Sequence, residues 1–387
     1  MTPTISDYYD IESFNRMKAF AETRETPFLV LDTSIVSRQY DELLHFFPFA
    51  KIYYAVKANP APGLINLLRD KGSSFDIASI YELDRVLAAG VSPDRVSFGN
   101  TIKKAKDVRY FFEKGVRMFA TDSEADLRNI AKAAPGSKIY VRLLTEGTQT
   151  ADWPLSRKFG CQTDMALDLL VLARDLGLVP YGLSFHVGSQ QRDIGAWDAA
   201  IAKVKVIFER LSEEDNIHLK MINLGGGFPA NYINRTHDLA TYAEEIIRFL
   251  HEDFGDDLPE IILEPGRSLV GNAGLLVSEV VLISRKSRTS LHRWVYLDVG
   301  KFSGLIETMD ESIKYPVWSD KQGELEDSVL AGPTCDSADI MYEDHRYPLP
   351  LTLAIGDRLY WFSTGAYTTS YSAIEFNGFP PLKAYYI

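Results

Sequence analysis

A lysine closes an apolar run near the start of the chain, in Ile52-Tyr53-Tyr54-Ala55-Val56-Lys57-Ala58-Asn59-Pro60. The β-branched and aromatic residues before Lys57 predict a buried strand, and the Asn-Pro pair after it predicts a turn. A lysine held in apolar surroundings has its pKa lowered, and an uncharged amine can form a Schiff base with an aldehyde. The alternative is a lysine whose ammonium group reaches solvent from the strand end.

Glycines and an arginine follow two later apolar runs, as Gly225-Gly226-Gly227 and as Gly266-Arg267. Glycine lets backbone N–H groups approach phosphate oxygens, and arginine adds charge-assisted hydrogen bonds. A glycine triplet alone could be a flexible turn, and the absence of a following Gly-Lys-Ser/Thr argues against a nucleotide P-loop. Together with a lysine at a strand end, these features indicate a phosphorylated aldehyde cofactor, pyridoxal phosphate (PLP).

Polar residues near other expected strand ends fit the same cofactor. A carboxylate such as Glu264 against the pyridine nitrogen keeps that nitrogen protonated, so the ring can act as an electron sink. His186 could stack on the ring, although a lone histidine is more often a hydrogen-bonded core residue. Ser189 offers a further phosphate ligand. Asp76 and Arg142 could lie near the lysine, and a structural salt bridge between those two is an equally good interpretation.

These residues are spaced along a repeating pattern of short apolar runs and helical segments. A helix is expected over residues 80–89, with Gly90 as its C-cap. Strands alternating with helices predict an α/β fold, a (β/α)8 TIM barrel, whose strand ends carry the active site. An open doubly wound sheet is the alternative. The expected strands are residues 52–57, 74–79, 96–100, 118–122, 139–143, 183–188, 221–225 and 261–266.

The pattern of the sequence changes after Arg267. Short β runs alternate with Gly, Pro and Asp turns, and helical periodicity is scarce, which predicts an antiparallel β domain. We therefore expect a PLP-binding barrel over residues 28–267 and a C-terminal β domain over residues 268–387, with residues 1–27 packing on it. The expected β runs are residues 277–283, 294–298, 328–331 and 358–362.

The composition is that of an ordinary globular chain, long enough for two domains, with 387 residues, 46% hydrophobic and 24% charged. The net charge of −12 argues against a nucleic-acid partner. The first residues lack the features of a signal peptide, and no apolar run approaches the roughly 18 residues that span a bilayer, so no membrane partner is expected. The two cysteines, Cys161 and Cys335, favour a cytoplasmic location, and no Cys/His spacing predicts a metal site.

The chain resembles the fold-type III PLP-dependent decarboxylases, the alanine-racemase-like family that acts on ornithine, lysine and diaminopimelate. The resemblance covers nearly the whole chain and is strongest to ornithine decarboxylases, including bacterial enzymes that also accept lysine. It rests on motifs in family order: Tyr54-Ala55-Val56-Lys57, Phe75-Asp76-Ile77-Ala78-Ser79, Lys158-Phe159-Gly160, Ser184-Phe185-His186-Val187-Gly188-Ser189, Gly225-Gly226-Gly227-Phe228-Pro229, Glu264-Pro265-Gly266-Arg267, Gly332-Pro333-Thr334-Cys335-Asp336 and Gly365-Ala366-Tyr367-Thr368.

The resemblance implies a role for each matched position. Lys57 would hold PLP, Glu264 would pair with the pyridinium, and His186 would lie over the ring. Cys335 would protonate the substrate carbon after CO2 leaves, and Asp336 would take the distal ammonium. Both would come from the partner subunit of a homodimer with shared active sites. The remaining cofactor contacts would come from Asp76, Arg142, Ser189, Gly225, Gly226, Gly227, Gly266, Arg267 and Tyr367, and Tyr367 would also border the substrate.

Two of these roles stay open when the residues are considered alone. A cysteine is a weak acid that can give up a proton near neutral pH. Free cysteines are nevertheless more often small buried hydrophobic residues, and we assign Cys161 to that class. Asp336, followed by Ser337, could instead form a turn or a helix cap.

Substrate choice depends on residues 304–315, which match the specificity region of the family. Asp310 aligns with the acidic residue that helps to bind the distal amine, and Glu307 stays as an alternative because the match needs a length difference nearby. The family implies Glu in place of Asp336 for diaminopimelate, and large insertions for arginine. We predict decarboxylation of L-ornithine to putrescine in polyamine biosynthesis. Lysine giving cadaverine comes second, because one methylene changes discrimination by only about 1–3 kcal/mol.

Two other classes of protein are weighed against a decarboxylase. An amino-acid racemase of this fold places an arginine against the pyridine nitrogen, where this chain would place Glu264. A non-catalytic PLP-binding homologue lacks the β domain, the lysine or the cysteine, and this chain has all three.

Overall fold

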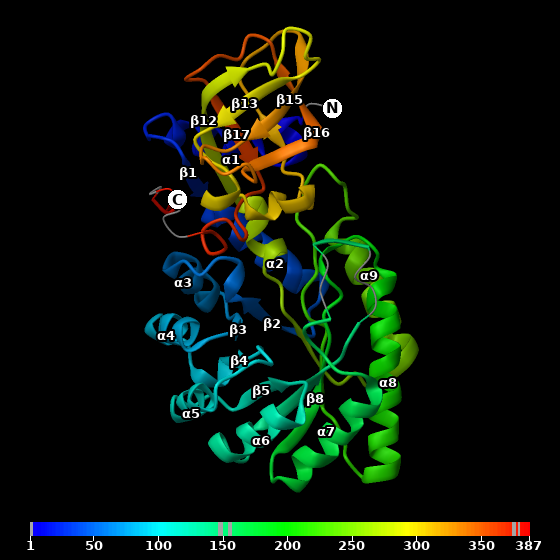
Figure 1. Ribbon diagram of the computed structural model, residues 1–387. Coiled ribbons are helices and arrows are strands. Elements are labelled where there is room, and N and C mark those ends of the chain that lie inside the picture. Colours follow the sequence, from blue (N-terminus) through cyan, green and yellow to red (C-terminus); the bar gives the residue numbers. More distant parts are fainter. Residues whose placement is uncertain (1–2, 146–149, 154–156, 374–376, 378–379) are drawn as a thin grey trace. The chain divides into compact units, whose positions relative to one another are not determined.

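The computed structural model describes residues 3–145, 150–153, 157–373, 377 and 380–387. The chain divides into two compact units (Figure 1). The barrel unit comprises Gln39–Pro229 and His237–Gly266, and the β unit comprises Met1–Arg38, Ala230–Thr236 and Arg267–Ile387. The boundaries that we expected at residues 28 and 267 stay a prediction.

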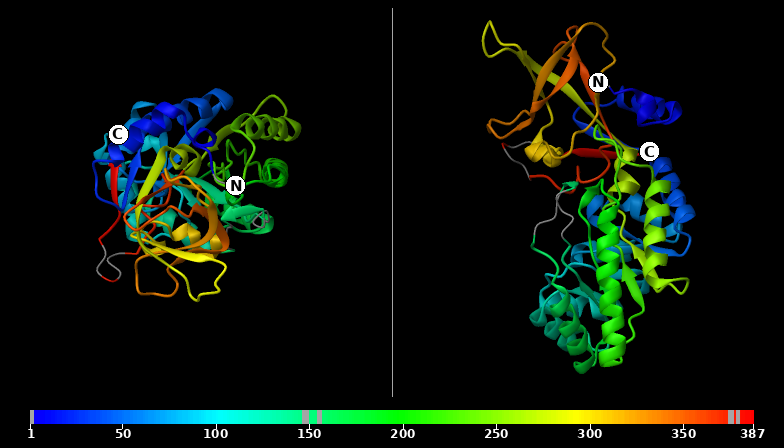
Figure 2. Two further views of the ribbon diagram at one scale, coloured as in Figure 1. Left: turned by 90° about the horizontal axis from the view of Figure 1, so that it is seen from above. Right: turned by 90° about the vertical axis from the view of Figure 1, so that its right-hand side faces the viewer.

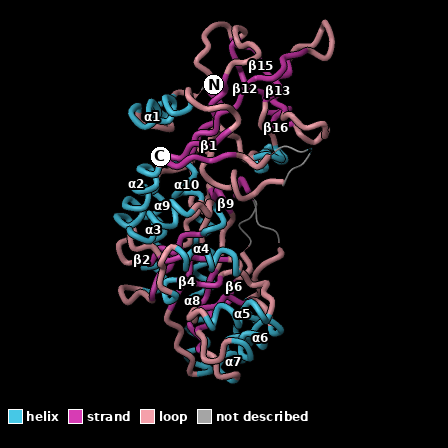
Figure 3. The backbone as a smooth tube through the Cα atoms, turned by 90° about the vertical axis from the view of Figure 1, so that its left-hand side faces the viewer, coloured by secondary structure: helices cyan, strands magenta, loops and turns pink. Residues whose placement is uncertain are grey.

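Parallel strands of the barrel unit close into a barrel in the order β10-β11-β2-β3-β4-β5-β6-β8, which confirms the predicted (β/α)8 fold. Helices lie around the outside of these strands (Figures 1 and 3). The strands are β2 (Ala50–Ala55), β3 (Ser74–Ile77), β4 (Val96–Phe98), β5 (Met118–Thr121), β6 (Lys138–Arg142), β8 (Val179–Ser184), β10 (Met221–Asn223) and β11 (Glu260–Leu263). The helices are α2 (Thr33–Phe46), α3 (Pro62–Asp70), α4 (Ile80–Ala88), α5 (Ala105–Glu113), α6 (Glu124–Ala133), α7 (Thr163–Asp175), α8 (Gly195–Asp215) and α9 (Leu239–Phe254).

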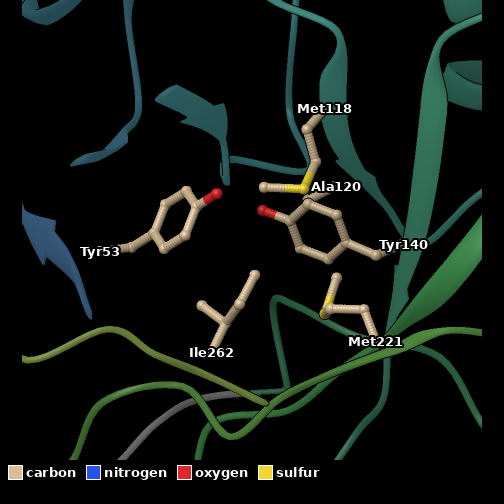
Figure 4. Packing of buried hydrophobic residues seen from close by; sticks show 6 residues of the cluster. All are labelled: Tyr53, Met118, Ala120, Tyr140, Met221 and Ile262. Carbon is tan, nitrogen blue, oxygen red and sulfur yellow. The ribbon is translucent and has the colours of Figure 1, made fainter. Parts of the chain in front are cut away.

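The barrel strands are nearly continuous apolar runs because parallel strands are covered on both faces. β5, for example, is buried at every position. Side chains that point inward fill the barrel, and Figure 4 shows the Tyr53 and Tyr140 hydroxyl groups directed toward the middle of this cluster. The barrel interior is therefore a packed core, and chemistry is left to the carboxyl ends of the strands. The cluster consists of Tyr53, Met118, Ala120, Tyr140, Met221 and Ile262.

A short antiparallel pair follows two of the barrel strands. β7 (Ala151–Trp153) pairs with β9 (Ser189–Gln191), so Ser189 lies at the start of a fixed strand. An ion pair between Arg192 and Asp152, 2.9 Å long, supports the pairing. The Tyr242 hydroxyl adds a hydrogen bond of 2.7 Å to the carbonyl oxygen of Gln191.

The β unit is built on one sheet, most of whose strands are yellow, orange and red in Figure 2. Its strands follow the order β14-β17-β12-β13-β15-β16, with β1 paired to β12 and β18. Most pairs are antiparallel, as predicted, but β13 with β15 and β1 with β18 are parallel. The strands are β1 (Phe28–Leu31), β12 (Gly274–Ser284), β13 (Arg293–Leu297), β14 (Val317–Trp318), β15 (Leu325–Ala331), β16 (Ile340–Pro350), β17 (Arg358–Phe362) and β18 (Lys383–Tyr386). The helices are α1 (Ile11–Ala21), α10 (Arg267–Val270) and 3-10 helices at Ile5–Asp7, Gly271–Ala273, Lys301–Ser303 and Ile306–Glu311.

The N-terminal residues pack on this sheet. Helix α1 begins after Asp10, whose side chain accepts a hydrogen bond of 2.8 Å from the Ser13 backbone. The Tyr9 hydroxyl donates to the carbonyl oxygen of Gly274 at 2.6 Å, and its ring meets Phe362 edge-on at 5.3 Å between centroids. Among the described residues, no helix has the length and apolar character needed to cross a membrane.

Candidate active site

Lys57 lies just beyond the first barrel strand. β2 ends at Ala55, and Lys57 is the middle residue of a 3-10 turn, Val56–Ala58. Its side chain is exposed, so our expectation of an amine in apolar surroundings is wrong. Its electrostatic neighbours are acidic instead: burial raises the pKa of Asp76 and of Glu82, and the charge of Lys57 opposes both shifts. An exposed amine on a fixed turn is accessible to an aldehyde.

Asp76 on β3 is enclosed by protein on most sides. The Ser97 hydroxyl donates to its Oδ1 at 3.1 Å, and a Cβ on Gly99 would lie 2.0 Å from the same oxygen. Glycine at position 99 therefore makes room for this carboxylate. Burial and the neighbouring charge of Glu264 raise the pKa of Asp76 well above its usual value, against the opposing effect of Lys57. Asp76 is thus a carboxyl group that can hold a proton within the field of Lys57.

Arg142 ends β6 and does not pair with Asp76. Burial lowers the pKa of Arg142, and the charges of Glu264 and Asp76 oppose that shift, but among the described residues no direct ion pair joins Arg142 to Asp76, so the two do not form the salt bridge given as the alternative. The Arg142 guanidinium instead lies over the Phe159 ring, 4.9 Å from its centroid. The Arg142 carbonyl accepts a hydrogen bond of 3.0 Å from the backbone of Cys161, and burial raises the pKa of the Cys161 thiol to about 12. Cys161 is therefore an inert, mostly buried thiol, close to our assignment.

Glu264 directly follows β11, and a residue that the sequence analysis missed holds its carboxylate. Asn223, the last residue of β10, donates from Nδ2 to Glu264 Oε1 at 2.5 Å and accepts at Oδ1 from the Gly225 backbone at 2.9 Å. Asn223 is 1% exposed, so water does not compete for these bonds. It ties the carboxylate expected at the pyridine nitrogen to the glycine loop expected at the phosphate. Asn223 could have been identified from the sequence, because it lies at the end of a predicted strand and two residues before the glycines.

His186 lies two residues beyond β8, which ends at Ser184. Its Nδ1 accepts a hydrogen bond of 3.0 Å from the Gly188 backbone, which leaves the ring proton on Nε2. Burial, and next the positive charges of Arg142 and Lys57, lower the pKa of His186 well below its usual value. The imidazole is therefore neutral at neutral pH and fixed in orientation, as stacking on an aromatic ring requires.

The glycine loop of residues 225–227 is closely surrounded by backbone. A Cβ atom on any of the three glycines would lie within 2.7 Å of a neighbouring backbone oxygen. Only glycine fits, and a bare backbone of this kind allows close approach of phosphate oxygens. A Cβ on Gly266 would lie 2.9 Å from the Cβ of Ala58, so the end of the last barrel strand packs against the turn that carries Lys57. The residues of the barrel unit therefore fit PLP.

Arg267 and Tyr367 belong to the β unit, where they form a buried cluster. Arg267 is 3% exposed and donates to both carboxylate oxygens of Glu307, at 2.8 and 2.6 Å, and to the Tyr232 hydroxyl at 2.9 Å. The guanidinium lies 4.8 Å from the ring centroid of Tyr367. Burial alone would lower the pKa of Arg267, but Glu307 outweighs it and the pKa is raised. Removing one partner of such a pair costs about 3–5 kcal/mol.

This cluster bears on the substrate pocket. The Glu307 carboxylate is occupied by Arg267 and is 2% exposed, so it is not presented to a substrate amine. Asp310, three residues later, is exposed. The geometry therefore favours Asp310 over Glu307.

Cys335 and Asp336 are also exposed. The backbone N–H and the thiol of Cys335 both donate to Asn377 Oδ1, at 3.2 and 3.5 Å. The hydrogen bond from the thiol sets the direction in which its S–H group points. Asp336 accepts a hydrogen bond of 2.8 Å from the Ala338 backbone, so its carboxylate does form the turn given as the alternative. That turn fixes the carboxylate and is compatible with a role in binding.

Comparison with known proteins gives the family. The family model described as pyridoxal-dependent decarboxylase, pyridoxal binding domain, matches residues 33–271. The chain belongs to the pyridoxal-dependent decarboxylase family. The prediction of PLP as cofactor is thereby confirmed, as is the resemblance on which it rested.

Relatives and solved structures of the family cover nearly the whole chain. The lysine/ornithine decarboxylase of Selenomonas ruminantium is 34% identical, over 95% of this chain and 91% of the relative. The structure of the lysine/ornithine decarboxylase of Vibrio vulnificus complexed with cadaverine matches with a TM-score of 0.88 at 30% identity, covering 98% of this chain and 99% of that one.

Two other relatives set limits on the function. The structure of the arginine decarboxylase of Paramecium bursaria Chlorella virus is 29% identical with a TM-score of 0.88, and the match covers 97% of this chain and 100% of that one. An arginine decarboxylase thus exists without large insertions, and our exclusion of arginine by chain length is wrong. Antizyme inhibitor 2 of Xenopus laevis is 32% identical over 93% of this chain and 80% of the relative, so membership alone does not establish catalysis.

Proposed function

We propose that this protein decarboxylates L-ornithine to putrescine and CO2 with PLP as cofactor. Lysine giving cadaverine is the alternative. The observation that carries the decarboxylase reaction is the carboxylate of Glu264, held by Asn223 beside the glycine loop. A carboxylate at the pyridine nitrogen favours the fully delocalised carbanion of a decarboxylation, whereas the racemases of this fold place an arginine there.

Each residue of the barrel unit has one task in this proposal. Lys57 would hold the cofactor aldehyde, Glu264 would keep the ring nitrogen protonated, and neutral His186 would lie over the ring. The glycine loop and Ser189 would hold the phosphate, with Arg267 and Tyr367 completing the site. When bound, PLP supplies the electron sink that accepts the electron pair left as the carboxylate departs as CO2.

The β unit would supply substrate recognition and the final proton. The Cys335 thiol, oriented by Asn377, would give its proton to the substrate carbon. Asp310 and Asp336 would meet the distal ammonium, because a desolvated ammonium without a partner is very costly. Relatives named for lysine and ornithine support a basic substrate of this length.

We further propose a homodimer in which each active site takes Cys335 and Asp336 from the partner. The exposure of both residues is compatible with that arrangement. Both cysteines are free thiols, which fits the cytoplasmic location that we expect. A non-catalytic role, as the name of the antizyme inhibitor suggests for that relative, is disfavoured because Lys57 and Cys335 are both present.

The test is release of CO2 from a panel of L-ornithine, L-lysine, L-arginine and diaminopimelate by the purified protein with PLP. Ornithine is expected to give the highest kcat/KM, with lysine next. Preference for arginine would overturn the proposed substrate but not the reaction. Absence of CO2 from every substrate, with racemisation of an amino acid instead, would overturn the reaction.

A further inference from the structure

The segment that carries Asp310 has an unusual backbone. It is the 3-10 helix Ile306–Glu311, interrupted at Met309 by extended angles, φ −55° and ψ 132°. Asp310 and Glu311 follow, each with a φ of 53°. A left-handed angle is tolerated by Asp but is strained for Glu, so two in succession need support from outside the segment.

Glu311 provides support at one end of the segment. Its carboxylate accepts three backbone hydrogen bonds, each 2.8 Å long, from the consecutive residues Glu343, Asp344 and His345 of β16. The Glu311 carbonyl oxygen also accepts a hydrogen bond of 2.8 Å from Lys314 Nζ. Bonds to an ionised acceptor are roughly twice as strong as neutral ones, so this end of the segment is firmly attached to the sheet.

Glu307 provides support at the other end. Its two carboxylate oxygens each accept a hydrogen bond from Arg267, and both side chains are shielded from water. The Glu307 carbonyl oxygen accepts a further bond of 3.0 Å from the Ile313 backbone. Asp310 lies between these two attachments and is exposed.

We propose that Glu307 and Glu311 are positioning residues that clamp this segment at both ends and fix where Asp310 presents its carboxylate. The inference rests on the proposed function, in which Asp310 meets the distal ammonium. Ornithine and lysine differ by one methylene group. The Asp310 carboxylate can therefore prefer one of them only if it is held at a fixed position along the substrate side chain. The clamp therefore sets the chain-length preference of the enzyme.

The experiment compares Glu311→Ala, which removes the anchor, with Glu311→Gln, which keeps one acceptor oxygen. Glu343→Ala is the matched control, because it removes an exposed glutamate from β16 and leaves the donating backbone in place. For Glu311→Ala, kcat/KM for ornithine should fall about tenfold and the ornithine-to-lysine ratio should shrink. Norvaline, which lacks the distal amine, should be unaffected. Glu311→Gln should lie between wild type and Glu311→Ala.

Amide hydrogen exchange at residues 343–345 reports on the clamp without any substrate. Exchange there should be faster in Glu311→Ala than in wild type and in the control. Unchanged exchange would overturn the clamp. Faster exchange with an unchanged ornithine-to-lysine ratio, or equal losses on norvaline, would overturn its role in specificity.

Failure of the proposed function has a different signature. Wild-type protein would then treat ornithine and norvaline alike, while the exchange experiment would still decide whether the clamp exists. If Glu311→Ala does not fold, the ornithine-to-lysine ratio is measured instead in Glu311→Gln and Glu307→Gln, each of which weakens the anchor at one end of the segment. Both should reduce the ornithine-to-lysine ratio, and a ratio unchanged in both would overturn the proposal.

Discussion

The barrel unit and the β unit hold their candidate site residues in different ways. In the barrel, Asn223, Glu264 and His186 lie at strand ends and are fixed by hydrogen bonds to one another or to the loops beside them. In the β unit, Cys335 and Asp336 are exposed on a loop.

This difference indicates a division of labour. Groups fixed at the ends of barrel strands suit the chemistry of the cofactor, which is the same for every substrate. The acidic groups Asp310 and Asp336 of the β unit suit recognition, which depends on what the substrate carries at its far end, and Cys335 adds the final proton. Substitutions in the barrel should therefore affect all substrates alike, and substitutions of the recognition residues Asp310 and Asp336 in the β unit should discriminate between them.

The largest effect is expected for Lys57→Ala. Loss of the amine that holds the cofactor should lower kcat on the order of a thousandfold or more, for ornithine and lysine equally. Borohydride reduction of wild-type protein with PLP, followed by peptide mapping, should place the label on Lys57. Lys51→Ala, on the preceding strand, should be labelled like wild type. A label on Lys158 or Lys301 would contradict the assignment.

A somewhat smaller loss is expected for Glu264→Gln. The cofactor should stay bound, with kcat lowered by about 10²–10³, because a preorganised charge acts mainly on the transition state. Asn223→Leu should lower kcat in the same direction by less, since the carboxylate remains but is no longer held. Ser184→Ala is the control, because Ser184 pairs with Asn223 in register on β8. Near-wild-type kcat for Glu264→Gln would show that the ring nitrogen has another partner.

Asp336→Ala should separate substrates instead of affecting them alike. For ornithine, kcat/KM should fall. The loss of transition-state stabilisation should lie near the low end of about 2–5 kcal/mol, because this carboxylate is exposed before substrate binds. Norvaline should lose far less, and PLP absorbance should persist. Equal losses on both substrates would place Asp336 in folding or subunit contacts and would remove the contrast between the two units.

Subunit mixing tests whether one site draws on two chains. Lys57→Ala and Cys335→Ala proteins should each be nearly inactive and, once mixed, should recover about a quarter of wild-type activity. Random reassociation makes half of the dimers mixed, each with one intact site. Mixing either variant with itself is the control. No recovery despite measured exchange of subunits would mean that each chain completes its own site.

The sequence was informative wherever topology decides position. All eight barrel strands were expected, because continuous apolar runs and helical spacing follow directly from burial on both faces. Lys57, His186 and Glu264 were predicted as site residues from the same pattern, since charged and polar side chains are uncommon beside such buried runs unless they have a specific task. β14, with two residues, was too short to give a pattern, and β16 contains the charged stretch Glu343-Asp344-His345-Arg346 in its middle.

The sequence did not predict which side chains contact each other across long stretches of the chain. Arg267 with Glu307 joins residues 40 positions apart, and Asn223 with Glu264 joins residues 41 apart. No periodicity encodes such pairs. The sequence left open whether Lys57 is buried or reaches solvent, because a strand pattern does not show that the chain turns after Ala55; the exposed lysine given as the alternative is the one that the structure has.

The smallest effect concerns the pH dependence of the clamp in the β unit. Burial raises the pKa of Glu311, but the backbone hydrogen bonds from Asp344, Glu343 and His345, together with Lys314, outweigh it and lower the pKa. Since the folded-state pKa lies below the unfolded value of about 4.3, the contribution of Glu311 to stability is present above that value. It is lost as the pH falls through the folded-state pKa.

The Tm of wild type should therefore exceed that of Glu311→Gln by on the order of 2 °C at neutral pH. The difference should shrink as the pH falls below about 4, as far into acid as the fold persists. Thermal unfolding of both proteins across this range measures it. Burial, and next the charge of Lys314, lower the pKa of His345, whereas the charge of Glu311 raises it, so the histidine titrates differently in the two proteins. The comparison is therefore made with His345→Gln present in both, which removes this titration from the difference. Glu343→Gln, on the same strand, should show no such dependence. A difference that grows toward acid would mean that the Glu311 carboxylate is strained and not anchored, and the β unit would then lack the fixed support that the barrel has.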